Sequence, residues 1–334
     1  MHHAALLRES RRPVAIWLFT LAAMVAAMVA LGGLTRLTGS GLSMVEWNPH
    51  HLLPPLTGAE WDDAFAKYQA TPEYRLVNAG MDLAGFQSIF WLEYVHRLWG
   101  RLIGFAFALP LAYFAWCRLV DRPLLKRLGL IFALGAGQGG LGWFMVASGL
   151  VDHPEVSHFR LAAHLAVALL ILAALLWTAL DLAGTRRPAP CPAWLAASLV
   201  MTTITWGAFV AGLDAGLVYN TFPLMAGQWL PGDGLDILHA HGAVQFAHRV
   251  LAVTTVLALT LLALRWRPAW PAAAWSWGQA ALGIATLLLH VPIALAVLHQ
   301  MGAVMLVALL TWALHGTERR KHEFTTKTPR HQEA

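Results

Sequence analysis

The chain has 334 residues, of which 58% are hydrophobic and only 12% are charged. A soluble globular domain carries roughly 25% charged residues, so this composition excludes an ordinary soluble protein and predicts an integral membrane protein. The formal net charge of +5 comes from basic residues placed between apolar segments, so it does not indicate nucleic-acid binding.

Eight apolar stretches are long enough to cross a bilayer, which takes about 20 helical residues. They lie at residues 13–34, 86–117, 128–149, 159–180, 193–213, 242–264, 272–290 and 293–314. Lys and Arg gather in segments such as 118–127 and 319–330, which are cytoplasmic if the N-terminus is inside. Both termini are therefore predicted to be cytoplasmic. No cleavable signal or long presequence is evident, which favours the inner (plasma) membrane of a bacterium.

The longest outer loop is predicted at residues 35–85. Within it, Thr57 and Glu60 have the spacing of a capping box. The residues that follow have apolar side chains at helical spacing and predict a short amphipathic helix: Trp61, Ala64, Phe65 and Tyr68. We expect this helix to pack on the bundle or to lie at the membrane interface rather than to dock a partner. A loop of this length could also act as a lid over a membrane-embedded site.

The order of motifs indicates a duplicated four-helix unit. His96-Arg97 corresponds to His248-Arg249, and the Gly-Gln pair at 137–138 corresponds to the pair at 278–279. The predicted fold is an all-α membrane protein with eight transmembrane helices in two tandem four-helix bundles. The predicted boundaries are a cytoplasmic N-terminus at 1–12, halves at 13–182 and 193–315, a cytoplasmic linker at 183–192 and a disordered cytoplasmic tail at 316–334.

Four histidines occupy matching places in the two halves: His96 and His164 in the first, His248 and His299 in the second. Each lies within about ten residues, or about 15 Å, of the outer end of its span. One such histidine would more simply be a packing residue, but four at one depth favour metal ligation. Zinc fits poorly because three or four ligands do not gather at useful spacing. Haem fits better, since two imidazoles from facing helices can bind iron from both sides of a macrocycle.

Glu93 lies three residues before His96 and therefore on nearly the same helix face. A carboxyl group there suits proton transfer or the stabilisation of a developing positive charge. The alternative is a structural ion pair with Arg97 or Arg101. The second half has Gln245 at the corresponding place, so we expect chemistry in the first half and a bound haem in the second.

The two arginines that follow the ligand candidates, Arg97 and Arg249, lie about 100° around the helix from them. They should not point at the iron. They are candidates to bind haem propionates at the outer rim, and the alternative is that they reach the interface by snorkelling.

Together with further motifs, these residues resemble the haem A synthase family in its mitochondrial and alphaproteobacterial-like branch. The motifs lie at residues 32–43, 72–74, 93–97, 145–150, 212–225, 245–249 and 299–300, and the resemblance covers about residues 14–315. Some bacterial members carry cysteine pairs in the outer loops. Here Cys117 and Cys191 both fall on the cytoplasmic side, so no disulfide and no thiol chemistry is expected in those loops.

The resemblance implies that a ring methyl of haem O is oxidised to the formyl group of haem A for terminal oxidase assembly, with water as the oxygen source. It implies that His248 and His299 hold haem b as an internal electron carrier. The substrate haem O is then received between His96 and His164, with Glu93 as the essential acidic residue.

Two other functions explain the histidines: a quinol-linked dihaem cytochrome b that only carries electrons, and a haem chaperone or transporter without chemistry. The electron carrier gives Glu93 no necessary role, and the chaperone would hold its haem in the first half only transiently. The expected partners are the lipid bilayer, the farnesyltransferase that makes haem O and an electron acceptor of unknown identity. Nucleic acid is not expected, and homo-oligomer formation is left open.

Overall fold

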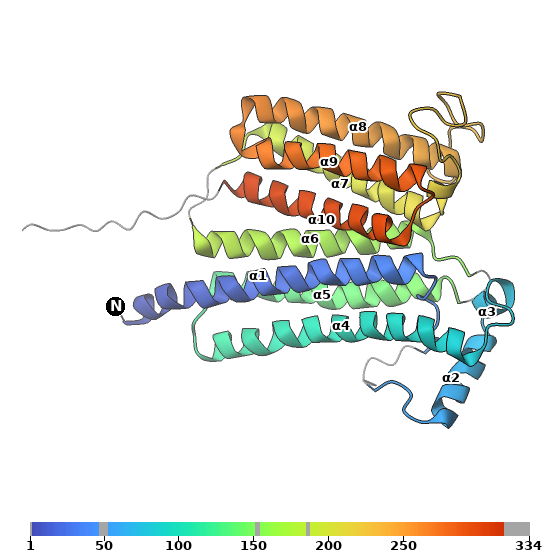
Figure 1. Ribbon diagram of the computed structural model, residues 1–334. Coiled ribbons are helices and arrows are strands. Elements are labelled where there is room, and N and C mark those ends of the chain that lie inside the picture. The colour runs from blue at the N-terminus through green and yellow to red at the C-terminus, as the bar shows by residue number, and fades with distance from the viewer. Residues whose placement is uncertain (1, 47–52, 151–153, 185–187, 317–334) are drawn as a thin grey trace, which may run out of the picture.

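The computed structural model describes residues 2–46, 53–150, 154–184 and 188–316 (Figure 1). These residues form helices and loops without any strand beyond one isolated bridge between Met225 and Gln228. The helices are α1 (His2–Leu37), α2 (Gly58–Gln69), α3 (Pro72–Leu76), α4 (Leu83–Trp116), α5 (Arg122–Ala147), α6 (His158–Ala183), α7 (Cys191–Gly212), α8 (His241–Arg265), α9 (Trp270–Leu288) and α10 (Ile293–His315), with short 3₁₀ turns at Ala215–Leu217 and Arg267–Ala269.

Among the described residues, 7 helices are long and apolar enough to cross a membrane: α1 from Arg11, α4, α5, α6, α7, α8 and α10. The chain is therefore a multi-pass membrane protein. The eighth predicted span, residues 272–290, does form a helix, α9, but this helix is not among the seven. Its 19 residues are dominated by Ala, Gly and Trp rather than by Leu, Ile and Val, which lowers its hydropathy.

The long helices run side by side in two sets (Figure 1). The first set, α1, α4, α5 and α6, shares a core that includes Leu18 and Leu172. The second set, α7 to α10, shares a core that includes Leu259 and Leu310. Helices α1, α6 and α10 contact one another where the sets meet. The N-terminus and the end of α10 lie at the same end of the bundle (Figure 1).

Polar contacts join the two sets near the opposite end. The Gln300 side chain of α10 donates to the Val29 carbonyl of α1 at 2.8 Å. Arg36, at the end of α1, donates to the Ala211 carbonyl and pairs with Asp214 at 2.9 Å. The two sets are therefore tied together by hydrogen bonds as well as by packing.

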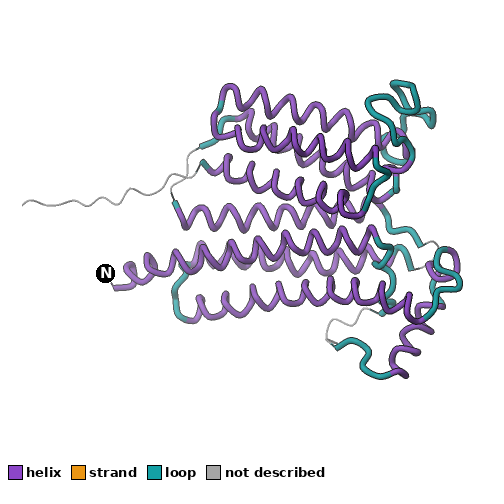
Figure 2. Tube along the Cα trace, viewed as in Figure 1, coloured by secondary structure: helices purple, strands orange, loops and turns teal. Residues whose placement is uncertain are grey.

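The end of the bundle where α4, α6, α8 and α10 begin carries the long loops (Figure 2). The predicted amphipathic helix is confirmed as α2, with both hydrogen bonds of its capping box. Its Tyr68 is fully buried and stacks on Phe86 of α4, with the ring centroids 5.1 Å apart. Helices α2 and α3 thus pack on the bundle, as expected, through an aromatic cluster.

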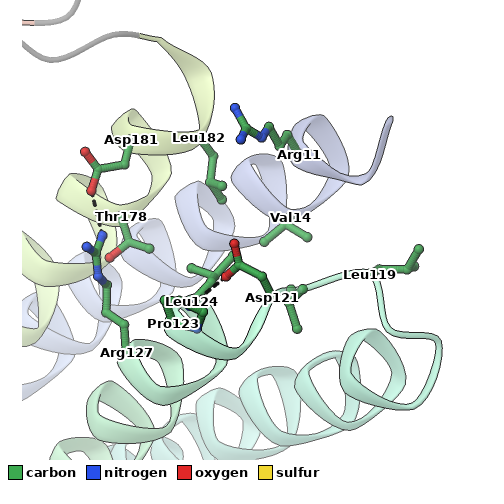
Figure 3. Close-up of a pocket in the computed structure, with 11 residues that line it drawn as sticks. Arg11, Val14, Leu119, Asp121, Pro123, Leu124, Arg127, Thr178, Asp181 and Leu182 are labelled. Carbon is green, nitrogen blue, oxygen red and sulfur yellow. Dashed lines mark hydrogen bonds and ion pairs between the residues drawn. The ribbon is translucent and has the colours of Figure 1, made fainter. Parts of the chain in front are cut away.

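A small cavity of about 260 Å³ lies at the other end, between α1, α5 and α6 (Figure 3). Arg127 of α5 pairs there with Asp181 of α6 at 2.6 Å. The second Asp181 oxygen lies 3.0 Å from Nε2 of the buried His315 of α10. This network fastens three helices together. The predicted tail lies outside the described residues from position 317 onwards, as do positions 185–187 of the predicted linker.

Candidate functional site

A large cavity of about 1540 Å³ extends through both sets of helices and is lined mostly by apolar side chains. All four predicted histidines line it: His96 on α4, His164 on α6, His248 on α8 and His299 on α10. Each lies in the first half of its helix, and these helices begin at the same end of the bundle (Figure 2). The structure therefore brings the four histidines to one end, as the sequence predicted.

Each imidazole packs against a glycine of a neighbouring helix. A methyl group at the glycine α-carbon would lie close to the Cε1 atom of the ring: 3.1 Å at Gly32 for His96, 3.0 Å at Gly142 for His164, 3.0 Å at Gly207 for His248 and 2.7 Å at Gly283 for His299. The same contact occurs four times, between α1 and α4, α5 and α6, α7 and α8, and α9 and α10. The sequence alone does not predict this contact, because a glycine in an apolar helix does not reveal which side chain it faces.

The two Gly-Gln pairs also have a structural role that the sequence did not reveal. Gln138 of α5 donates to the His164 carbonyl at 2.8 Å, and Gln279 of α9 donates to the His299 carbonyl at 2.7 Å. Each glutamine therefore fixes the helix turn that carries the histidine. The repeated order of the motifs was the only sequence signal for this role.

The ring nitrogens show how the histidines could serve as ligands. His248 donates from Nδ1 to the Thr203 carbonyl at 3.1 Å, which leaves a lone pair on Nε2. The Nδ1 atoms of His96 and His164 are buried without a hydrogen-bond partner among the described residues. His96 and His164 belong to the first set of helices, and His248 and His299 belong to the second. The four histidines therefore form two pairs.

Glu93 is 3% exposed and lines the same cavity. Its Oε1 accepts hydrogen bonds from Arg97 Nε at 3.0 Å and Nη2 at 2.6 Å, and its Oε2 accepts from the Ser43 hydroxyl at 2.7 Å and the Met44 amide at 2.8 Å. Four donors thus surround the carboxylate. The ion pair considered from the sequence is present, and it holds a negative charge at the cavity wall.

Gln245 occupies the corresponding place in the second set, but the backbone groups around it are mainly hydrogen-bond acceptors instead of donors. Its amide nitrogen donates to the Ala215 carbonyl at 2.9 Å and to the Tyr219 carbonyl at 3.3 Å, while its oxygen accepts from Arg249 at 3.1 Å. A carboxylate could not donate these bonds. The loops therefore supply hydrogen-bond donors around Glu93 and acceptors around Gln245. In each half the loop matches the side chain that is present.

The two arginines line the cavity, but their guanidinium groups are tied to loop carbonyls. Arg97 donates to the Met44 carbonyl at 2.8 Å and the Glu46 carbonyl at 2.9 Å. Arg249 donates to the Tyr219 carbonyl at 2.9 Å. The snorkelling alternative has each guanidinium group reach the membrane interface, whereas here each one binds a loop carbonyl. They place positive charge at the end of the cavity where a carboxylate of a bound ligand could meet it.

The donor set suits haem iron. The described residues contain no group of three or more His, Cys, Asp or Glu that could hold a metal ion. Each histidine pair instead offers two imidazoles, which is the number that a six-coordinate haem takes from a protein. A typical small-molecule pocket measures roughly 300–1,000 Å³, so a cavity of about 1540 Å³ exceeds what one ligand requires.

These features define a class of protein: a multi-pass helical membrane protein with two histidine pairs in one apolar cavity. The chain belongs to the COX15-CtaA family of cytochrome oxidase assembly proteins, whose pattern it matches over residues 15–311. The resemblance stated from the sequence is thereby confirmed.

Individual relatives are similar over nearly the whole chain. A heme A synthase of Paramagnetospirillum magneticum is 49% identical, with 93% of this chain and 95% of the relative covered. Heme A synthases of Nitrosospira multiformis and Rhodospirillum centenum are 45% and 48% identical, covering 93% and 91% of this chain and 95% and 88% of the relatives.

Proposed function

We propose that this protein is a haem A synthase, an oxidoreductase that converts a ring methyl of haem O to the formyl group of haem A for terminal oxidase assembly. The observation that carries the proposal is the difference between two otherwise similar sites in one cavity. Both have a histidine pair, and the position three residues before the first histidine is a carboxylate in one half, Glu93, and an amide in the other, Gln245. Relatives of this chain bear the name heme A synthase, which supports the same conclusion.

In this proposal the substrate haem O lies between His96 and His164, and haem b is held by His248 and His299. The repeated glycine contacts and the repeated glutamine bonds support an origin by duplication, with halves at 13–182 and 193–315. Helix α9 then completes eight membrane crossings. The termini face the cytoplasm of a bacterium, and the histidine end of the bundle faces the periplasm.

The proposed role of Glu93 follows from its hydrogen bonds. With four donors around it, the carboxylate has no free position for a proton, so we assign it to the stabilisation of positive charge that develops on the oxidised carbon. The apolar cavity wall strengthens this interaction, because water does not screen it. Arg97 keeps the carboxylate in place. Arg97 and Arg249 are proposed to contact the haem propionates at the rim.

Haem b would supply one-electron transfer when it is bound. The residues of this chain would orient it through the Nδ1–H bond of His248 and the packing of His299 on Gly283. Electrons then leave to an acceptor outside the chain. The farnesyltransferase that produces haem O is the proposed supplier of substrate.

The test is mass spectrometry of haems extracted from protein purified from cells that supply haem O. We expect haem A or its alcohol precursor in the wild type. Glu93→Gln should accumulate haem O, with conversion reduced about 100-fold, the size of effect that loss of one electrostatic group causes. Asp62→Asn removes an exposed carboxylate of α2 and should leave conversion unchanged.

Each alternative function predicts a different result. A dihaem electron carrier would hold two haems tightly and change neither of them, in the wild type as well as in Glu93→Gln. A haem chaperone would release its haem unmodified. Unmodified haem O in the wild type, with the histidine-ligated spectrum intact, would refute the synthase proposal.

A further inference from the structure

A second buried carboxyl group, in addition to Glu93, lines the cavity. Glu73 belongs to α3, outside the membrane-spanning helices, yet it is only 6% exposed. Its Oε2 atom is buried and has no hydrogen-bond partner among the described residues. A buried carboxyl oxygen without a partner is unfavourable unless it is protonated or has a function. Glu73 therefore needs an explanation that the packing of α3 does not give.

The backbone around Glu73 is held firmly. Thr71 caps α3, and the Glu73 carbonyl accepts hydrogen bonds from the amides of Val77 at 2.9 Å and Asn78 at 3.0 Å. The Asn78 side chain in turn donates to the Tyr68 hydroxyl at 2.7 Å. Tyr68 stacks on α4, the helix that carries Glu93. The position of Glu73 at the cavity is thus fixed by the same aromatic cluster that fastens α2 and α3 to the bundle.

The electrostatic surroundings favour an exchangeable proton on Glu73. The pKa of Glu73 is raised from its ordinary 4.5 to about 7, mainly by burial; a hydrogen bond from Tyr68 opposes the shift, and the charge of Glu93 adds to it. Burial also raises the pKa of Tyr68 to about 12, so Tyr68 remains a neutral donor. The other charged groups of this half of the cavity wall are Arg36, Arg97, Arg101 and Glu155. Two neighbouring carboxyl groups commonly divide their roles in this way, one ionised and one protonated.

We propose that Glu73 is the proton-exchanging acid of this cavity: its free oxygen takes up protons released at the site beside Glu93 and passes them to water on the loop side of the bundle. The inference rests on the proposed function. Oxidation of a methyl group to a formyl group with water as oxygen source releases protons and electrons in equal numbers; a haem held by His248 and His299 would supply the electron transfer to the external acceptor. Each transfer through Glu73 converts its carboxylate to the acid and back again. Glu93, whose two oxygens accept four hydrogen bonds, takes no part in this transfer.

Two measurements on the full-length protein test this role. The first is the extraction assay on Glu73→Gln, which should bind haem O as the wild type does but convert it about 100-fold more slowly, the lower end of what proton transfer contributes. Glu73→Asp retains an acid on a shorter side chain and should recover part of the rate with an altered pH profile. Asp62→Asn serves again as the control.

The second measurement is infrared titration, which does not depend on turnover. The wild type should show a carboxylic acid C=O band that disappears as the pH rises through about 7. This band should be absent from Glu73→Gln. If Glu73→Gln assembles poorly, Glu73→Asp decides the question, because an unchanged band and an unchanged pH profile of conversion would overturn the proposal.

The outcomes separate the two proposals. Conversion at the wild-type rate and with the wild-type pH profile in Glu73→Gln would overturn the role of Glu73 and leave the synthase function standing. Absence of conversion in the wild type itself would overturn both. Slow conversion in Glu73→Gln together with loss of the infrared band supports both.

Discussion

The contact between Gly283 and His299 provides a sharp test of how the ligand position is set. In Gly283→Ala the new methyl group would lie 2.7 Å from Cε1, 3.3 Å from Nδ1 and 3.4 Å from Nε2 of the His299 ring. Ordinary van der Waals contact begins at 3.4 Å. The ring therefore has to withdraw from α9, and it withdraws from the position in which it would bind a haem. Gly278 is a matched control on the same helix, because a methyl group there meets nothing within 4 Å.

Two effects of Gly283→Ala on stability oppose each other. Alanine favours a helix over glycine by roughly 1 kcal/mol, while overpacking costs about 1–3 kcal/mol. The net change in the free energy of unfolding is therefore between about zero and a loss of about 2 kcal/mol. Gly278→Ala receives only the favourable effect. The effect on haem binding should be larger, since a misplacement approaching 1 Å can reduce function about 100-fold.

The assay is the haem-to-protein ratio of the purified variants, together with the reduced-minus-oxidised spectrum and the melting temperature in detergent. We expect Gly283→Ala to lose the haem of the second half, and Gly278→Ala to retain it with an equal or higher melting temperature. Equal haem content and equal spectra in the two variants would refute the idea that the ring-on-glycine contact sets the ligand position.

The other expected outcomes concern charge. Because the pKa of Glu73 is raised from 4.5 to about 7, the folded chain binds this proton more tightly than the unfolded chain, so proton binding favours the fold at low pH and the advantage is lost as the pH rises through this window. Relative to wild type, Glu73→Gln should therefore gain up to about 3 kcal/mol between these pH values, measured as the difference in melting temperature against pH; a flat difference would contradict the assigned shift. Asp181→Asn should reduce the free energy of unfolding by about 1–3 kcal/mol, because His315 and Arg127 lose their shared carboxylate. The loss should appear as a lower melting temperature. Asp121→Asn is the control: asparagine can still cap α5, so the free energy of unfolding should stay unchanged. Gln245→Glu should lower expression and haem content because it sets a carboxylate against carbonyl oxygens; normal assembly would show that the loop adapts.

Much of the architecture could be predicted because it depends on local patterns. Hydropathy located all the long helices, and the capping box at Thr57 located α2. Repetition of the motif order predicted that His96 and His248 lie at one depth. Equivalent residues of helices that start at the same end of the bundle lie at the same distance from that end. The prediction of a membrane span at 272–290 is met only as a helix, because Ala, Gly and Trp give a helix little hydropathy.

The parts that the sequence did not reveal depend on contacts between distant segments. Gln138 was recognised as a repeated residue, but its partner on α6 is set only by packing. Glu73 was seen as part of a loop motif, and no local pattern indicates that α3 folds back to bury it. Asp214 belongs to the motif at residues 212–225, which indicated no partner for it. It adopts a left-handed conformation in a turn, but its side chain pairs with Arg36 instead of capping a helix.

The shared cavity also bears on how the protein is maintained in its membrane. A bundle hollowed by about 1540 Å³ lacks much of the side-chain contact that normally fills a core, so a group bound there would take the place of core side chains. Any ligand that binds only the folded chain raises its stability by mass action. On the proposed function, the haem of the second half stays while the first half empties after every turnover, and the Gln300 bond to α1 spans the boundary between them. Haem supply would then govern the stability of the chain as well as its activity.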